Sequence, residues 1–117
     1  MKCPHTLKAG PYIYRVGLDK TDENYGATHL VEKIILFGSG CQSGEQHLVT
    51  LIHEWFHIAE ENSTVPEGSR MDHNQMRLLS TWVVDLLQQL GLDTNLDASG
   101  LPAWQLGGVP VPTEKSV

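Results

Sequence analysis

Two of the six histidines in this 117-residue chain stand four residues apart, in the run His53-Glu54-Trp55-Phe56-His57. Residues four apart in a helix lie one turn above each other, so two imidazoles at this spacing can converge on one metal ion. The carboxylate of Glu54 then lies beside them, placed to take a proton from a metal-activated water. At the chain's own composition the bare H-E-x-x-H pattern arises by chance at a rate of about 2%.

The sequence around this motif predicts a helix with two different faces. At about 100° per residue, the apolar side chains gather within about 80° of Leu48, and the motif lies on the opposite arc. The apolar face holds Leu48, Leu51, Ile52, Trp55, Phe56, Ile58 and Ala59, and the polar face holds Thr50, His53, Glu54, His57 and Glu61. The bland alternative is a solvated polar face that happens to contain two histidines. It is disfavoured because such faces usually carry Lys or Arg, and this helix has neither.

Residues 50–61 (TLIHEWFHIAEE) resemble the active-site helix of the zincin metallopeptidases. The match is closest to the small gluzincin-like peptidases of phages and bacteria, which often read T-L-x-H-E-x-x-H before an acidic helix end. Outside this helix the resemblance is one of pattern only, over roughly residues 12–91. The metzincin pattern would need Gly at position 60 and His at position 63, where this chain has Glu60 and Ser63.

The resemblance implies Zn²⁺ and a third ligand from the following helix. In the similar peptidases this ligand is a Glu near the start of that helix, whereas here His73 occupies the matching region. The strict gluzincin pattern is therefore broken, but three imidazoles hold zinc well. Asp72 is a rival ligand, although with Gln75 it also fits the cap of the second helix. Glu60 and Glu61 are further rivals, but both would crowd the open side of the metal.

The remaining candidate side chains carry weaker signals. His47 falls near the edge of the polar face, where it could bind substrate or orient a ligand, or be a surface histidine. Tyr25 and His47 are candidate donors to the oxyanion of a peptidase. His5 and His29 have no partner at metal spacing. Trp55, Phe56 and Trp82 stand at core spacing, and we expect them to pack.

The elements that must position these residues can be placed from periodicity and capping signals. Alternation predicts a strand over residues 12–18, and a β-branched apolar run predicts a second strand over residues 31–37, with a short extended piece at 27–30 as a further candidate before it. Ser43 with Gln46 predicts the start of the motif helix, which we expect to end near residue 61. Asp72 with Gln75 predicts the start of the second helix, which Gly91 ends.

Together these elements predict an α+β fold. A small, mostly antiparallel sheet of two to four strands packs on the apolar back of the motif helix, and the second helix crosses it and delivers His73. The resemblance to zincins implies an edge strand beside the cleft, assigned to residues 31–37, which can bind an extended peptide. We expect a zincin-like domain over residues 1–91 and a C-terminal tail over 92–117. The tail docks through residues 101–106, anchored by Trp104, and frays beyond Pro112.

Composition bounds the partners and the compartment. The net charge is −6, with eight Lys and Arg spread thinly, which disfavours a nucleic-acid groove or an anionic membrane surface. No apolar run approaches the roughly 18 residues that span a bilayer. Cys3 and Cys41 are the two cysteines, too few for a disulfide framework, and a reducing cytoplasm fits best.

The sequence therefore predicts a zinc-dependent metallopeptidase acting on a peptide or protein substrate. His53, His57 and His73 hold the metal, and Glu54 is the general base. Two other classes stay open: a non-catalytic metal-binding regulator or interaction module on a zincin scaffold, and a structural zinc domain. Glu54 favours the enzyme, because a structural site has no use for a carboxylate beside the metal and takes four protein ligands.

Overall fold

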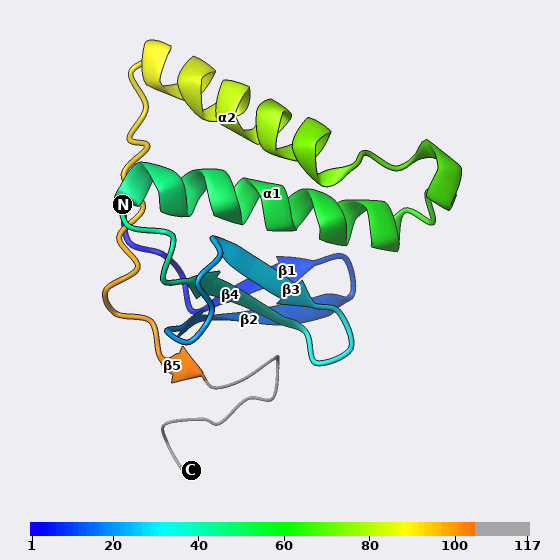
Figure 1. Cartoon of the computed structure of the whole chain (residues 1–117), viewed down its shortest axis with the longest axis horizontal. Coiled ribbons are helices and arrows are strands. Elements are labelled where there is room, and N and C mark those ends of the chain that lie inside the picture. Colours follow the sequence, from blue (N-terminus) through cyan, green and yellow to red (C-terminus); the bar gives the residue numbers. More distant parts are fainter. Residues whose placement is uncertain (105–117) are drawn as a thin grey trace.

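Within residues 1–104, five strands and two α-helices form three layers, with the sheet at the bottom, α1 in the middle and α2 on top (Figure 1). This computed structural model describes residues 1–104. The α+β class predicted from the sequence is confirmed. The elements are β1 (Thr6–Ala9), β2 (Tyr12–Asp19), β3 (Gly26–His29), β4 (Ile34–Gly38), α1 (Gly44–Asn62), a 3₁₀ turn (Glu67–Ser69), α2 (His73–Gln89) and β5 (Ala103–Trp104).

The sheet is mixed, so the prediction of a mostly antiparallel sheet is wrong. Its order is β1-β2-β4-β3, and β5 pairs with β2. The pairs β1·β2 and β3·β4 are antiparallel, but β2 runs parallel to both β4 and β5. Strand β3 lies between β2 and β4 in the chain, but in the sheet it pairs with the side of β4 that faces away from β2. Because the chain runs back along β3 before it enters β4, β4 can run parallel to β2 after a short connection.

The edge strand beside the helices is β3, which corrects the assignment of the edge to residues 31–37. Strand β4 begins only at Ile34, and all five of its residues are buried between β2 and β3. The residues before it form a turn in which Lys33 has a φ of 61°. Val31, expected in the strand, is 86% exposed in that turn. The β-branched side chain of Val31 favours a strand, but the residue belongs to the turn before β4.

Both helices begin where their capping signals predict. In α1 the hydroxyl of Ser43 accepts from the backbone N–H of Gln46 at 3.2 Å, and in α2 the carboxylate of Asp72 accepts from that of Gln75 at 2.8 Å. In each case the glutamine side chain returns a bond to the cap backbone. Gly91 ends α2 with a φ of 79°, as a residue without a Cβ can do at little cost.

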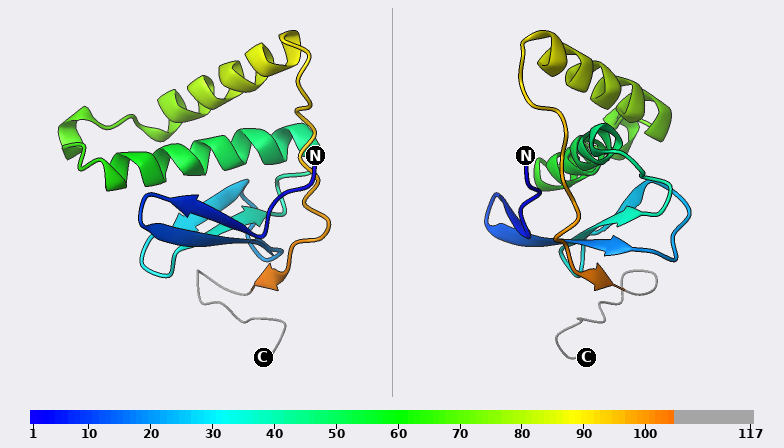
Figure 2. Two further views of the ribbon diagram at one scale, coloured as in Figure 1. Left: turned by 180° about the vertical axis from the view of Figure 1, so that it is seen from behind. Right: turned by 90° about the vertical axis from the view of Figure 1, so that its left-hand side faces the viewer.

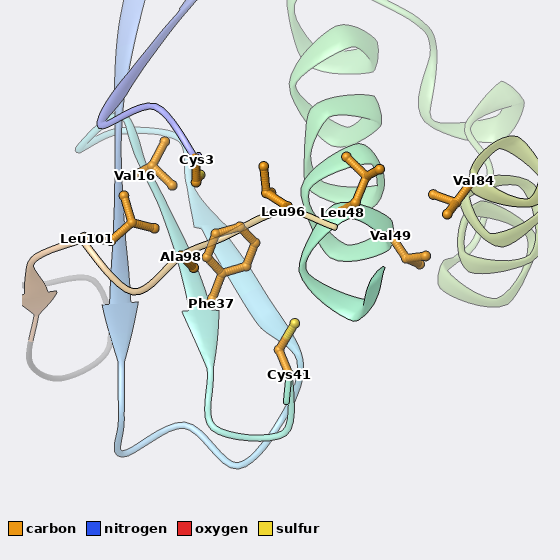
Figure 3. Close-up of a cluster of buried hydrophobic side chains, with 10 residues drawn as sticks. All are labelled: Cys3, Val16, Phe37, Cys41, Leu48, Val49, Val84, Leu96, Ala98 and Leu101. Carbon is orange, nitrogen blue, oxygen red and sulfur yellow. The ribbon is translucent and has the colours of Figure 1, made fainter. Parts of the chain in front are cut away.

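Helix α1 is covered on both sides, because it lies between the sheet and α2 (Figure 2). Its sheet side packs into the largest apolar cluster, where Phe37 and Leu48 meet Leu96 (Figure 3). Its other side receives three buried α2 residues: Met76, Ser80 and Val84. Of the motif residues on α1, His53 and Glu54 are buried and His57 is partly buried.

The outer face of α2 carries exposed apolar side chains. Trp82 is 64% exposed, so the prediction that it packs in the core is wrong. Leu78 and Leu86, one turn before and after it, are exposed on the same face. The spacing of apolar residues in α2 predicts an amphipathic helix. It does not show which of the two apolar stripes on α2 faces α1 and which faces outward. Trp55 and Phe56 on α1 are partly buried, and Trp55 packs against the cluster around Tyr14 and Ile58.

The described part of the C-terminal segment, residues 92–104, runs back past α1 to the sheet (Figure 1). Leu96 and Leu101 join the largest apolar cluster, and the N–H of Leu96 donates to the carbonyl of Gly44 at 3.1 Å. Trp104 is buried on Ile34 and Leu36, as expected of an anchor. The expected docking through residue 106 and fraying beyond Pro112 lie outside the described residues. No helix within residues 1–104 combines the length and apolarity needed to cross a membrane.

Candidate metal centre

Three structural elements converge on the H-E-x-x-H motif: the middle of α1, the first turn of α2 and the edge strand β3. His53 and His57 stand one turn apart on α1, and His73 is the first residue of α2. The segment entering α2 is fixed from α1, because the carboxylate of Glu60 accepts from the backbone N–H of Met71 at 2.9 Å. The helix cap at residue 72 then sets the direction in which His73 leaves the backbone.

Two of the distances between the ring nitrogens of the three histidines match the spacing of a tetrahedral metal site. Nε2 of His53 is 3.2 Å from Nε2 of His57 and 3.3 Å from Nδ1 of His73. A tetrahedral zinc ion with Zn–N bonds of about 2.0–2.1 Å holds its nitrogen ligands about 3.3–3.4 Å apart. All three ligand atoms lie within 4.8 Å of one another, and within residues 1–104 no other group of His, Cys, Asp or Glu does so.

His53 is the buried member of this triad and the one whose chemistry is most constrained. Its pKa is lowered from 6.5 to about 4, chiefly by burial and to a smaller extent by the nearby His57 and Arg77. The ring is therefore neutral at pH 7, as a metal ligand must be. Its Nδ1 is buried without a hydrogen-bond partner in the described structure. Nε2, which faces the other two rings, is thus the one nitrogen through which His53 makes polar contacts.

Glu54 is held beside the triad by the edge strand. The side chain is buried, and its Oε1 accepts a 2.7 Å hydrogen bond from the hydroxyl of Thr28 on β3. Its Oε2 lies 3.9 Å from Nε2 of His53. One carboxylate oxygen is therefore anchored and the other is directed toward the space beside the histidines. Sequence reasoning missed Thr28, because nothing local distinguishes a threonine that faces a helix carboxylate from any other strand threonine.

The acidic rivals for the third ligand position all have other partners. Asp72 caps α2, and Glu60 bonds the backbone of Met71. Glu61 accepts from Nη1 of Arg70 at 3.1 Å. The described residues therefore bring together the three predicted histidines and leave the carboxylates in supporting positions.

No protein-family model, curated protein or solved structure matches this chain. The geometry of the triad and the motif helix consequently carry the functional argument by themselves.

Two hollows flank the triad and share Gly26, Glu54 and His73 in their walls. One, of about 310 Å³, is completed by Asn24, Tyr25, His53, Asn74 and Arg77. The other, of about 410 Å³, is completed by Ala27, Thr28, Leu30, His57, Glu60, Glu61, Arg70 and Met71. Gly26 is required here because a Cβ would come within 2.5 Å of the carbonyl oxygen of Leu36. The two hollows follow β3, so a chain lying along this strand would pass the triad.

The weaker sequence candidates lie at different places. Tyr25 lines the smaller hollow, whereas His47 lies in the first turns of α1, where its Nδ1 donates to the carbonyl of Ser43 at 2.7 Å. His47 borders a separate hollow of about 450 Å³ at the carboxyl ends of β2 and β4. His5 and His29 are not in the triad. The oxyanion donor therefore stays a prediction, with Tyr25 the better placed of the two.

Proposed function

We propose that this protein is a zinc-dependent metallopeptidase whose zinc is held by His53, His57 and His73. The observation that carries the proposal is the convergence of three imidazole nitrogens within 4.8 Å of one another, with one anchored carboxylate beside them. Catalytic zinc sites use three protein ligands and leave the fourth position to water or substrate. The zincin resemblance of residues 50–61 points to the same chemistry.

When bound, zinc supplies a Lewis acid and a water of lowered pKa. Glu54 accepts the proton from the attacking water through its free oxygen and passes it to the amine of the departing peptide segment. Thr28 holds the other oxygen throughout, so the carboxylate keeps one orientation while its proton comes and goes. We assign the donor to the carbonyl oxygen under attack to Tyr25, which lines the smaller hollow.

The substrate in this proposal is an extended peptide laid along β3. This strand is the free edge of the sheet on the α1 side, and edge strands offer unpaired backbone groups to an added chain. The two hollows on either side of the triad then receive side chains from both sides of the scissile bond. The edge assigned from the sequence to residues 31–37 passes to β3, with the same consequence for peptide binding.

The alternatives are a structural zinc site and a non-catalytic metal-binding module. A structural site would bring a fourth protein ligand to the ion, but the group found in residues 1–104 contains three. A binding module has no need to bury Glu54 with one oxygen anchored. We also infer a reducing, cytoplasmic setting, which is supported by two buried free thiols, Cys3 and Cys41.

The test of this proposal is the variant Glu54→Gln, which keeps the size of the side chain but cannot take a proton. Zinc-loaded wild type and variant are incubated with a mixed peptide library, and cleavage is followed by mass spectrometry. We expect the variant to keep one zinc per chain and to lose activity by roughly 10²–10⁴-fold. Glu32→Gln, at an exposed turn and outside the walls of both hollows, is the matched control and should cleave as wild type does.

Three results would redirect the proposal. Loss of zinc in Glu54→Gln would make Glu54 a ligand and remove the base. Retention of both zinc and full activity would remove Glu54 from the chemistry. Zinc-loaded wild type that cleaves no peptide in the library would favour the non-catalytic module.

A further inference from the structure

Arg77 lies one helical turn after His73 on α2 and faces the same side of that helix. Its half-buried side chain lines the smaller hollow together with His53, Glu54 and His73. The guanidinium carbon sits 4.1 Å from the centre of the Tyr25 ring, a stacked position that fixes its plane. The second helix therefore brings two functional groups to this place, one suited to a metal and one suited to an anion.

The N–H donors of the Arg77 side chain have no partner among the described residues. Within residues 1–104 its guanidinium makes neither a hydrogen bond nor an ion pair, although it carries five N–H groups. Arg70, which lines the opposite hollow, differs in both respects, because it donates to Glu61 and to the carbonyl of Val65. A half-buried arginine whose plane is fixed but whose fork is free is preorganised for a planar anion such as a carboxylate.

The charges around the two hollows also differ. Among the described residues, Glu54 is the only carboxylate in the walls of the smaller hollow, which it shares with Arg77, His53 and His73. A divalent ion in the triad would leave this hollow with a net positive charge. In the larger hollow Glu60 and Glu61 join Glu54, and Arg70 is the single cation. An anionic group of a bound ligand is therefore drawn to the Arg77 side.

We propose that Arg77 forms a carboxylate-binding subsite next to the metal centre, and that the substrates carry a carboxylate close to the scissile bond. This inference rests on the proposed metallopeptidase function. The carboxylate belongs either to a C-terminal residue or to an Asp or Glu side chain, because both present the same two oxygens to the guanidinium fork.

Binding of small hydroxamates tests this subsite without requiring cleavage. The probes are the monohydroxamates of malonic, succinic and glutaric acid, each compared by calorimetry on zinc-loaded protein with its matching amide. The hydroxamate engages the metal, and the chain length varies the reach of the carboxylate. We expect at least one acid to bind about tenfold or more tightly than its amide, the usual strength of a hydrogen-bonded charge pair.

Variants assign the preference to Arg77. Arg77→Met should abolish it, and Arg77→Lys, which keeps the charge but not the fork, should retain part of it. Arg15→Met is the matched control, since Arg15 also stacks on an aromatic ring, that of Trp104, and does not line either hollow. It should keep the full preference. An acid preference that survives Arg77→Met, or no preference at any chain length in the wild type, overturns the proposal.

Short peptides used as competitors of the hydroxamate identify the source of the carboxylate. A gain from a C-terminal acid over its amide assigns a terminal carboxylate, and a gain from Glu over Gln within an amidated peptide assigns a side chain. Protein that binds no zinc would overturn this subsite together with the proposed function. A carboxylate preference in protein that cleaves no peptide would support the subsite and defeat the peptidase proposal alone.

Discussion

Zinc bound by the triad would tie α2 to α1, and this makes thermal stability a sensitive readout of the metal site. Helix α2 packs mainly on α1, through a stripe of buried residues that includes Met76, Ser80 and Val84. Two ligands come from α1 and one from α2, so the ion would cross-link the two layers. Unfolding would then require the release of the metal.

The size of the effect follows from mass action. Free zinc at 100 times its dissociation constant stabilises the native state by about 2.7 kcal/mol, provided that the unfolded chain binds none. For a domain of this length about 1 kcal/mol shifts the midpoint of thermal unfolding by about 4 °C. We therefore expect zinc to raise the midpoint of metal-free protein by about 10 °C, and a chelator to reverse the change.

Differential scanning calorimetry on wild type, His73→Ala and His5→Ala separates the bridge from general zinc binding. Without His73 the remaining pair lies on α1 alone, so most of the zinc-dependent shift should vanish. His5 is exposed and outside the triad, so its removal should change nothing. A shift in His73→Ala as large as that of the wild type would refute the bridge between the helices.

Three further predictions concern the supports of the site and the layers around it. Thr28→Val removes the hydroxyl that anchors Glu54, so zinc should be retained while peptidase kcat falls about tenfold, and Thr28→Ser should restore it; unchanged kcat in Thr28→Val would exclude the anchoring role. In urea unfolding, Trp82→Gln should lower the free energy of unfolding by less than about 0.5 kcal/mol and Met76→Ala should lower it by about 2–5 kcal/mol. A larger loss in Trp82→Gln than in Met76→Ala would contradict the packing of α2. Because burial lowers the pKa of His53 from 6.5 to about 4, unfolded metal-free chains take up a proton in that range and folded ones do not. Metal-free protein should thus lose stability as pH falls from 6.5 towards 4, and His53→Gln should lack that part of the loss.

Local signals in the sequence were enough to predict the two helices and the pair of histidines on α1. Each helix start is encoded by a short polar box, Ser43 with Gln46 and Asp72 with Gln75, whose bonds form within one turn. The spacing of His53 and His57 is likewise a property of one helix. His73 came from the family pattern, and its place beside the other two histidines is confirmed by the ring distances.

Features that depend on distant parts of the chain could not be read in this way. Strand β2 pairs in parallel with β4 because β3 takes the edge position on the other side of β4. No residue in β2 or β4 indicates which strand will be its neighbour. The Thr28–Glu54 bond joins residues 26 positions apart. The exposure of Trp82 depends on which of two apolar stripes of α2 meets α1. Strand β1 was missed because Thr6–Ala9 has only four residues, too few for an alternating pattern to be recognised.

X-ray absorption at the zinc edge of the loaded protein tests the central claim most directly, because it reports which atoms surround the metal. We predict three imidazole nitrogens at about 2.0–2.1 Å from the zinc and one oxygen from solvent, with two imidazoles left in His73→Ala. A closed shell of four protein ligands, or an unchanged imidazole count in His73→Ala, would contradict it.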